Sequence, residues 1–260
     1  MSRFRFCRQE NGELSRAVAA WFADQPGRRL VEHEREILCG MVDDLFGYGL
    51  LQLGELGTDQ DYLGHCPIKH KVTIGLDQSA SAGNSIAADA QQLPIASDCM
   101  DAVIIAHVLD FSPDPHQVLR EVERVLIPEG RVLIVGFNPY SLWGVWRLFG
   151  RWRGRVPWCG HFLSYSRLND WLTLLGFDIE RMDVAEFRPP TRSGHFDAFE
   201  RFARRYWPML AGVYVIRAVK RVSRVTPLRQ QWSRLRVLNP RVVEPSVREI
   251  ETLGGIKRSA

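Results

Sequence analysis

Residues 93–139 read LPIASDCMDAVIIAHVLDFSPDPHQVLREVERVLIPEGRVLIVGFNP, and they predict a strand, a helix and a second strand. The run 101–106 is short, apolar and rich in β-branched side chains, which is typical of a strand buried on both faces. Apolar residues at helical spacing follow over 115–126, with charged residues opposite them. A turn at 128–130 is expected to stop this helix before a second buried strand over 131–137. Two such strands joined by a helix imply a parallel sheet.

The same stretch resembles the middle of class I S-adenosylmethionine-dependent methyltransferases of the type 11 group. Three family phrases occur in order, as Leu93-Pro94-Ile95, as His107-Val108-Leu109-Asp110 with Asp114-Pro115, and as residues 119–130. The resemblance extends over roughly residues 45–221. It implies a Rossmann-like α/β fold, in which a mostly parallel sheet has an antiparallel last strand. Few residues separate Asp77 from Asp89, so we expect the third strand, at the sheet edge, to be short or missing.

The chain has 260 residues and 45% hydrophobic content, enough for one sizeable α/β domain with appendages. We expect four parts: N-terminal helices over 1–44 that cover the sheet, a methyltransferase-like domain over 45–221, a Trp- and Arg-rich insertion at 141–160 within it, and a flexible basic tail over 222–260. The N-terminal helices either close one face of the sheet or form a lid over the cofactor pocket.

The N-terminus shows no signal-peptide pattern, and no apolar run reaches transmembrane length. The five cysteines form an odd set without a C-x-x-C pair, which indicates neither a disulfide framework nor a zinc ribbon. We therefore predict a cytoplasmic protein with reduced thiols and no metal site.

The resemblance implies S-adenosylmethionine as cofactor, bound by the loop after the first strand. The glycine loop of the family stands here as Gly54, Glu55 and Gly57, with Gln52 and Leu56 where the family has an acidic residue and a further glycine. Glycines let the backbone approach a ligand closely at the carboxyl ends of such strands.

Three further positions complete the expected cofactor site. Asp77 follows the expected second strand, where the resemblance implies a carboxylate that binds the ribose hydroxyls; the alternative is a residue that starts a turn. Asp89 and Ala90 match the family's pair that touches the adenine ring and its amino group.

His107 and Asp110 follow the fourth strand, which in the family borders the methyl acceptor. They are candidates for a general base or for hydrogen-bond partners of the acceptor; the alternative for His107 is a histidine that holds the loop and packs. Trp143, Trp146 and Arg147 lie in the insertion and suit an apolar or anionic acceptor or a membrane interface, unless the helix packs its tryptophans on the domain.

The formal net charge of +4 is unevenly distributed. Residues 201–243 hold eleven Lys or Arg and no Asp or Glu, whereas the rest of the chain is net acidic. This predicts a solvated tail or one that binds an anionic partner, either nucleic acid or a membrane surface. The leading hypothesis is a methyltransferase for an unidentified acceptor; the alternative is a non-catalytic binding module of the same fold that uses its basic C-terminus.

Overall fold

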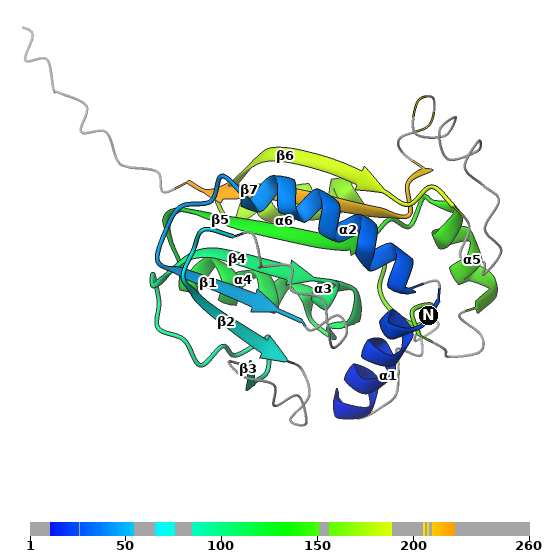
Figure 1. The fold of residues 1–260 in the computed structure, drawn as a ribbon, viewed down its shortest axis with the longest axis horizontal. Coiled ribbons are helices and arrows are strands. Elements are labelled where there is room, and N and C mark those ends of the chain that lie inside the picture. The colour runs from blue at the N-terminus through cyan, green and yellow to red at the C-terminus, as the bar shows by residue number, and fades with distance from the viewer. Residues whose placement is uncertain are drawn as a thin grey trace, which may run out of the picture. The chain divides into compact units, whose positions relative to one another are not determined.

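The computed structural model describes residues 11–25, 27–54, 66–75, 85–150, 156–188, 205, 207 and 210–221. Contacts divide the chain into two units, Met1–Ser223 and Arg224–Ala260. The second unit and the tail predicted over 222–260 lie outside the described residues. The first unit is built on one seven-stranded sheet (Figure 1).

The sheet has the strand order β3-β2-β1-β4-β5-β7-β6. The strands are β1 (Gly49–Leu53), β2 (His70–Gly75), β3 (Ser85–Ala87), β4 (Met100–Ala106), β5 (Leu126–Phe137), β6 (Phe177–Ala185) and β7 (Val213–Lys220). The strands from β3 to β5 pair in parallel, while β7 pairs antiparallel with both β5 and β6. The predicted Rossmann-like fold with an antiparallel last strand is confirmed, and the edge strand β3 is short, at three residues.

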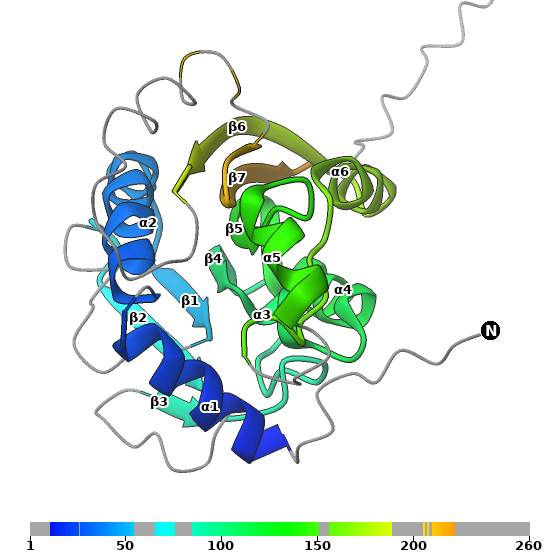
Figure 2. The ribbon, with the colours of Figure 1, turned by 90° about the vertical axis from the view of Figure 1, so that its right-hand side faces the viewer.

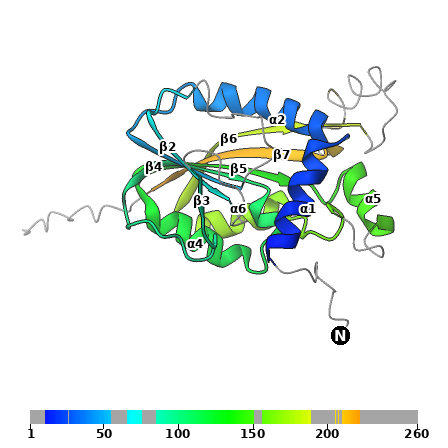
Figure 3. The same cartoon turned by 60° about the horizontal axis from the view of Figure 1, so that its bottom comes forward.

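Helices cover both faces of the sheet. They are α1 (Asn11–Ala23), α2 (Gly27–Val42), α3 (Val108–Phe111), α4 (Pro115–Val125), α5 (Leu142–Gly150) and α6 (Tyr165–Leu174). Figure 3 shows α2 on one face of the sheet and α4 and α6 on the other. The N-terminal segment therefore covers the sheet through α2, whereas α1 lies at the end of the sheet toward which β1 and β2 point (Figure 1).

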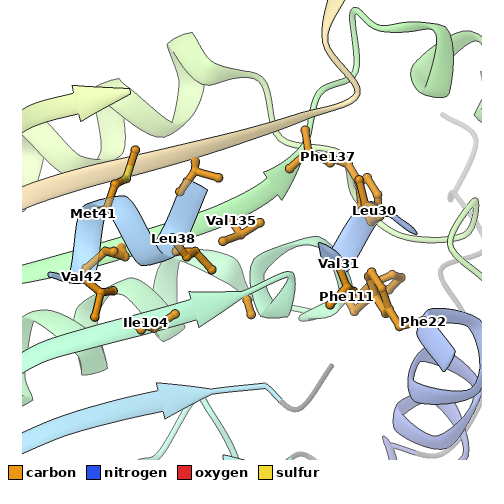
Figure 4. Close-up of a cluster of buried hydrophobic side chains, with 14 of the residues drawn as sticks. Phe22, Leu30, Val31, Leu38, Met41, Val42, Ile104, Phe111, Val135 and Phe137 are labelled. Carbon is orange, nitrogen blue, oxygen red and sulfur yellow. The ribbon is translucent and has the colours of Figure 1, made fainter. Parts of the chain in front are cut away.

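Alternation along the central strands divides the core into two layers. Ala102, Ile104 and Ala106 of β4 belong to the cluster that includes the buried side of α2, and Val103 and Ile105 belong to the cluster that includes α4 and α6. Figure 4 shows the first layer, in which apolar side chains of α2 face those of β4 and β5. Both faces of these strands are buried, which is why their sequences are almost continuously apolar.

The boundary between α4 and β5 differs from the prediction. The Asp114 carboxylate accepts a hydrogen bond from the Gln117 N–H and caps α4, as expected of this residue type. The helix, however, ends at Val125, and β5 begins at Leu126, which pairs with Met100. Leu126 is fully buried in the sheet, so its apolar side chain suited either assignment. The expected turn at 128–130 lies within an irregular part of β5, where Glu129 has a φ of +64°.

The described cysteines are of two kinds, free and disulfide-bonded. Cys39, Cys66 and Cys99 are free thiols. Cys159 is disulfide-bonded, so the prediction of reduced thiols is wrong at this position. Within the described ranges, no helix is long and apolar enough to cross a membrane.

Candidate functional site

The strand order reverses between β1 and β4, and ligands of open α/β sheets bind beyond the carboxyl ends of the strands at such a point. Figure 2 shows α1, α3 and α5 gathered around this end of the sheet. Gly54 follows β1 directly and has a φ of +88°, and its N–H donates to the Ile74 carbonyl at 3.1 Å. A Cβ at Gly54 would lie 2.7 Å from both the Ala106 oxygen and the Val108 Cγ2. The turn therefore requires glycine twice over, for its conformation and for its contact with β4.

Gln52 supports the same turn from within β1. Its side chain is buried, and its Nε2 donates to the Gly54 carbonyl at 3.1 Å. A carboxylate has no proton to donate in this way, so the amide holds the loop through a contact that the family's acidic residue cannot make. The altered residue at this position thus has a definite structural role.

The remaining cofactor candidates are only partly described. Asp89 is exposed, and its Oδ1 accepts from the Gln91 N–H at 2.9 Å, while Ala90 is buried beside it. Glu55, Gly57 and Asp77 lie outside the described residues. The described part of the expected cofactor site therefore consists of the Gly54 turn and the Asp89–Ala90 pair.

His107 and Asp110 lie together, and the structure adds Glu34 of α2 to them. His107 Nδ1 lies 2.9 Å from Asp110 Oδ2, and His107 Nε2 lies 2.9 Å from Glu34 Oε1. Asp110 Oδ2 also accepts from the Phe137 N–H at 3.1 Å. All three side chains are almost fully buried, with exposed fractions of 1% for His107, 1% for Asp110 and 0% for Glu34. We call these three residues the buried triad.

The buried triad favours a protonated imidazole. Burial opposes the charge on His107, but the Glu34 charge and the hydrogen bonds that His107 donates to both carboxylates outweigh burial and raise the pKa of His107 to about 9. Burial also raises the pKa of Asp110, while the hydrogen bond with His107 acts in the opposite direction. With both ring nitrogens donating, His107 is an imidazolium near neutral pH and has no lone pair for use as a base.

Two carboxylate oxygens of the buried triad remain available. Glu34 Oε2 and Asp110 Oδ1 are buried and have no hydrogen-bond partner among the residues that the structure describes. Buried polar atoms normally have partners, and exceptions often mark functional groups. The triad can therefore accept hydrogen bonds from a bound molecule without breaking those that hold His107.

Aromatic rings surround the buried triad. The His107 ring lies 4.3 Å from the Phe137 ring and 5.1 Å from the Phe22 ring of α1, measured between centroids. Trp143 and Phe162 stack against Phe137, at 5.8 and 4.7 Å. The α1 helix therefore contributes Phe22 to this apolar cluster at the end of the sheet, while the lid over the cofactor pocket stays a prediction.

A second ionic cluster fixes α2 at the same end of the sheet. Glu186, just after β6, is buried, and its carboxylate binds Arg29 Nη2 at 3.1 Å and His33 Nδ1 at 2.9 Å. Its backbone has a φ of +58°. Three ionic contacts, one at Glu34 and two at Glu186, thus attach α2 across the ends of β4 and β6.

The three insertion residues have different surroundings. Trp143 is buried, and its Nε1 donates to the Arg188 carbonyl at 2.8 Å, whereas Trp146 is exposed. The Arg147 guanidinium lies 5.0 Å from the Phe162 ring centroid, in cation–π contact. In the structure Trp143 stacks on Phe137 beside the buried triad, and Trp146 is exposed.

Glu34 was missed by the sequence reasoning, although the helix gave a signal. Leu30, Val31, Leu38 and Met41 are buried, and Glu34 occupies the same stripe of α2 at helical spacing. A carboxylate in a core position rarely stays unpaired, so it predicts a buried partner.

The part of the chain that the structure describes contains no group of three His, Cys, Asp or Glu that could hold a metal ion.

Comparison with known proteins agrees with this geometry. Residues 47–134 match the family model described as a methyltransferase domain. An uncharacterised protein of Escherichia coli K12, YafS, is 29% identical over 195 residues, which cover 74% of this chain and 78% of that protein. The 2-phytyl-1,4-naphtoquinone methyltransferase of Synechococcus elongatus is 27% identical over 132 residues, which cover 48% of this chain and about half, 53%, of that enzyme.

A solved structure supports the fold. It is a SAM-dependent methyltransferase from Thermotoga maritima, described as a possible histamine N-methyltransferase, and it aligns with a TM-score of 0.57 at 16% identity, covering 79% of this chain and 99% of that one. The strand order, the glycine turn at its reversal and the matched residues 47–134 agree with one another. Residues 47–134 therefore match the methyltransferase-domain family, and the structure has the Rossmann-like fold of S-adenosylmethionine-dependent methyltransferases.

Proposed function

We propose that the protein transfers a methyl group from S-adenosylmethionine to an acceptor bound beside the buried triad. The observation that carries the proposal is the glycine-only turn at Gly54, which lies where the strand order reverses and directly against the end of β4. His107 is the first residue after β4, and Gly54 is the first residue after β1. Because β1 and β4 pair, the Gly54 turn and the buried triad lie at neighbouring strand ends. Transfer by displacement needs mainly this kind of alignment between two bound molecules.

The residues fit the cofactor on the side of β1, β2 and β3. Gly54 offers backbone with no side chain in the way, and Asp89 presents an exposed carboxylate. We assign Gly54, Glu55 and Gly57 to the methionine part, Asp77 to the ribose hydroxyls, and Asp89 with Ala90 to the adenine. The cofactor supplies an electrophilic methyl group on a sulfonium.

The buried triad would bind the methyl acceptor. Asp110 Oδ1 and Glu34 Oε2 are the atoms with capacity to accept a hydrogen bond or a proton from the acceptor, because His107 uses both of its nitrogens. His107 would hold the two carboxylates in place and compensate their charge. The Phe22 ring of α1 lies 5.1 Å from the His107 ring, so an acceptor that reached His107 from the side of α1 would have to displace Phe22.

Calorimetry with purified protein tests the proposal. We expect S-adenosylmethionine and S-adenosylhomocysteine to bind with saturable heat, and Asp77→Ala to abolish it while leaving the circular dichroism spectrum unchanged. Asp170→Ala, on an exposed position of α6, is the matched control and should bind as the wild type does. Absence of binding in the wild type, or equal binding by Asp77→Ala, would contradict the proposal.

The basic segment suggests a second function, or a second step of the same one. Among the eleven basic residues over 201–243, Arg217, Lys220 and Arg221 form ion pairs within the domain. The basic residues beyond 221, with no acidic residue up to 243, suit an RNA, a DNA or another polyanion. Binding of this kind should weaken steeply with salt. Replacing Arg229, Arg234 and Arg236 by glutamine should reduce it, and RNA binding that resists both salt and these changes would exclude the tail as its site.

A further inference from the structure

The solvent-facing side of α5 is apolar, which is the reverse of an ordinary surface helix. Val145, Trp146 and Leu148 have exposed fractions of 52%, 46% and 63%, and Tyr140, just before the helix, is 70% exposed. On a helix Val145 and Leu148 lie on the side opposite the buried Trp143, and Trp146, three positions after Trp143, lies at the edge of the exposed side. We call Tyr140, Val145, Trp146 and Leu148 the α5 face.

Close contacts fix the helix in this orientation. A Cβ on Gly144 would lie 1.8 Å from the Pro139 oxygen, so the helix backbone lies directly on the preceding loop. The Ser141 hydroxyl accepts from the Gly144 N–H at 3.2 Å, and the Trp143 ring holds the opposite side through its bond to the Arg188 carbonyl. The helix cannot turn its α5 face inward without losing these contacts, so the exposure is built into the fold.

The sequence that contains α5 carries charge of one sign. Residues 130–169 contain no Asp or Glu, and Arg151, Arg153 and Arg155 follow the helix directly in the sequence. An apolar helix face with Trp and Tyr, followed by arginines and free of acidic residues, is the composition of a helix that lies in the surface of an anionic bilayer. Trp and Tyr favour the depth of the lipid headgroups, where one side of the ring is apolar and the other is wet.

We propose that the α5 face is a docking surface for anionic phospholipid membranes. Val145, Trp146 and Leu148 would enter the boundary between headgroups and acyl chains, and the following arginines would contact lipid phosphates. The basic residues distinguish this partner from an apolar protein groove, which would gain nothing from three arginines that follow the helix in the sequence.

Docking at α5 would also place the candidate acceptor site next to the lipid. Trp143, on the inner side of the same helix, stacks on Phe137, whose backbone N–H donates to Asp110. One helix thus separates the α5 face from the buried triad. This consequence rests on the proposed function and favours an acceptor that dissolves in the bilayer; the docking itself does not depend on it.

Cosedimentation of the full-length protein with vesicles tests the docking. The vesicles contain phosphatidylcholine alone or with roughly one third phosphatidylglycerol, a fraction that gives a surface potential in the range of anionic leaflets. We expect binding to the anionic vesicles only, and a reduction of at least about tenfold in the triple variant Val145→Ser, Trp146→Ser, Leu148→Ser. Leu174→Ser, at a residue of α6 that is 83% exposed, is the control and should bind like the wild type.

Two further experiments identify which part of the chain binds the vesicles. Brominated lipid should quench tryptophan emission in the wild type and much less in Trp146→Phe. If the triple variant binds as tightly as the wild type while Arg229→Gln, Arg234→Gln, Arg236→Gln loses binding, the tail is the membrane site and the proposal fails. The proposal also fails if the wild-type protein binds no vesicle. In that case, a dimer that forms with rising concentration in the wild type and is lost in the triple variant would identify the α5 face as a contact between copies of this chain. Cofactor calorimetry is independent of all these outcomes.

Discussion

Glu34 Oε1 lies 2.9 Å from His107 Nε2 and joins the middle of α2 to the end of β4, inside the core. Neither partner reaches water. Removal of one partner leaves a buried charge only partly compensated. The pair therefore controls how firmly the N-terminal segment is held.

Glu34→Ala is expected to lower the free energy of unfolding by about 3–5 kcal/mol, because it leaves the His107 charge with Asp110 alone. Glu34→Gln keeps a hydrogen bond and should cost less, roughly 2 kcal/mol. Urea denaturation of both variants measures this. Glu36→Ala, exposed on the same helix, should change the stability by less than about 0.5 kcal/mol, and an equal loss there would show that helix propensity is being measured.

Stability should fall as the pH rises above neutrality. The pKa of His107 is raised from 6.5 to about 9, so the folded protein keeps a proton that the unfolded chain releases between these values. The stabilisation by His107 is complete below pH 6.5 and is lost as the pH rises to about 9, an effect of roughly 3 kcal/mol. Melting temperatures between these two pH values record it.

His107→Asn is the control for this pH dependence, because asparagine tolerates the left-handed backbone at this position, where φ is +54°. The other groups that face His107 are Glu34 and Asp110, and buried Tyr214 lies in the field of Asp110 with its pKa raised above 10. A decline with pH that persists unchanged in His107→Asn would assign the effect to those groups.

Trp143 and Trp146, three positions apart on one helix, should respond in opposite ways. Trp143→Ala removes a buried ring that contacts Phe137 and should cost about 3–5 kcal/mol of stability. Trp146→Ala should cost less than about 0.5 kcal/mol because its side chain is largely in solvent. Thermal denaturation of the two variants compares them, and equal losses would mean that both rings pack on the domain.

Gly54→Ala is expected to cost roughly 1–3 kcal/mol and to weaken cofactor binding, since the added Cβ meets the Ala106 oxygen at 2.7 Å in a left-handed backbone. Gly40→Ala is the matched control. A Cβ at Gly40 in α2 has nothing within 4 Å and should raise stability by about 0.5–1 kcal/mol. Calorimetry and chemical denaturation read both effects, and unaltered cofactor binding in Gly54→Ala would remove this turn from the site.

The sequence predicted the central strands well because burial on both faces leaves a local signature. β4 and α4 could be predicted from their own residues. The short segment between Asp77 and Asp89 indicated a short β3. The end of α4 was misplaced because Leu126 is apolar in either a helix or a strand. Such boundaries depend on pairing with Met100, which local sequence does not reveal.

The candidate site was harder to predict than the fold. His107 and Asp110 lie three residues apart, so their contact was within reach of sequence reasoning. Glu34 is 73 residues from His107, and only its place on an apolar stripe hinted at burial. The sequence likewise did not predict which of Trp143 and Trp146 is buried, because tertiary contacts at Gly144 and Arg188 determine which face of α5 packs on the domain.

The anchoring of α2 also has a consequence for the order of folding. Arg29 and His33 must wait for Glu186, which is 157 and 153 residues further along the chain, and Glu34 must wait for His107. Contacts of such long range form late, because the loops between them have to close first. During synthesis α2 is therefore made well before its partners His107 and Glu186, and these contacts form only after both residues have been added to the chain.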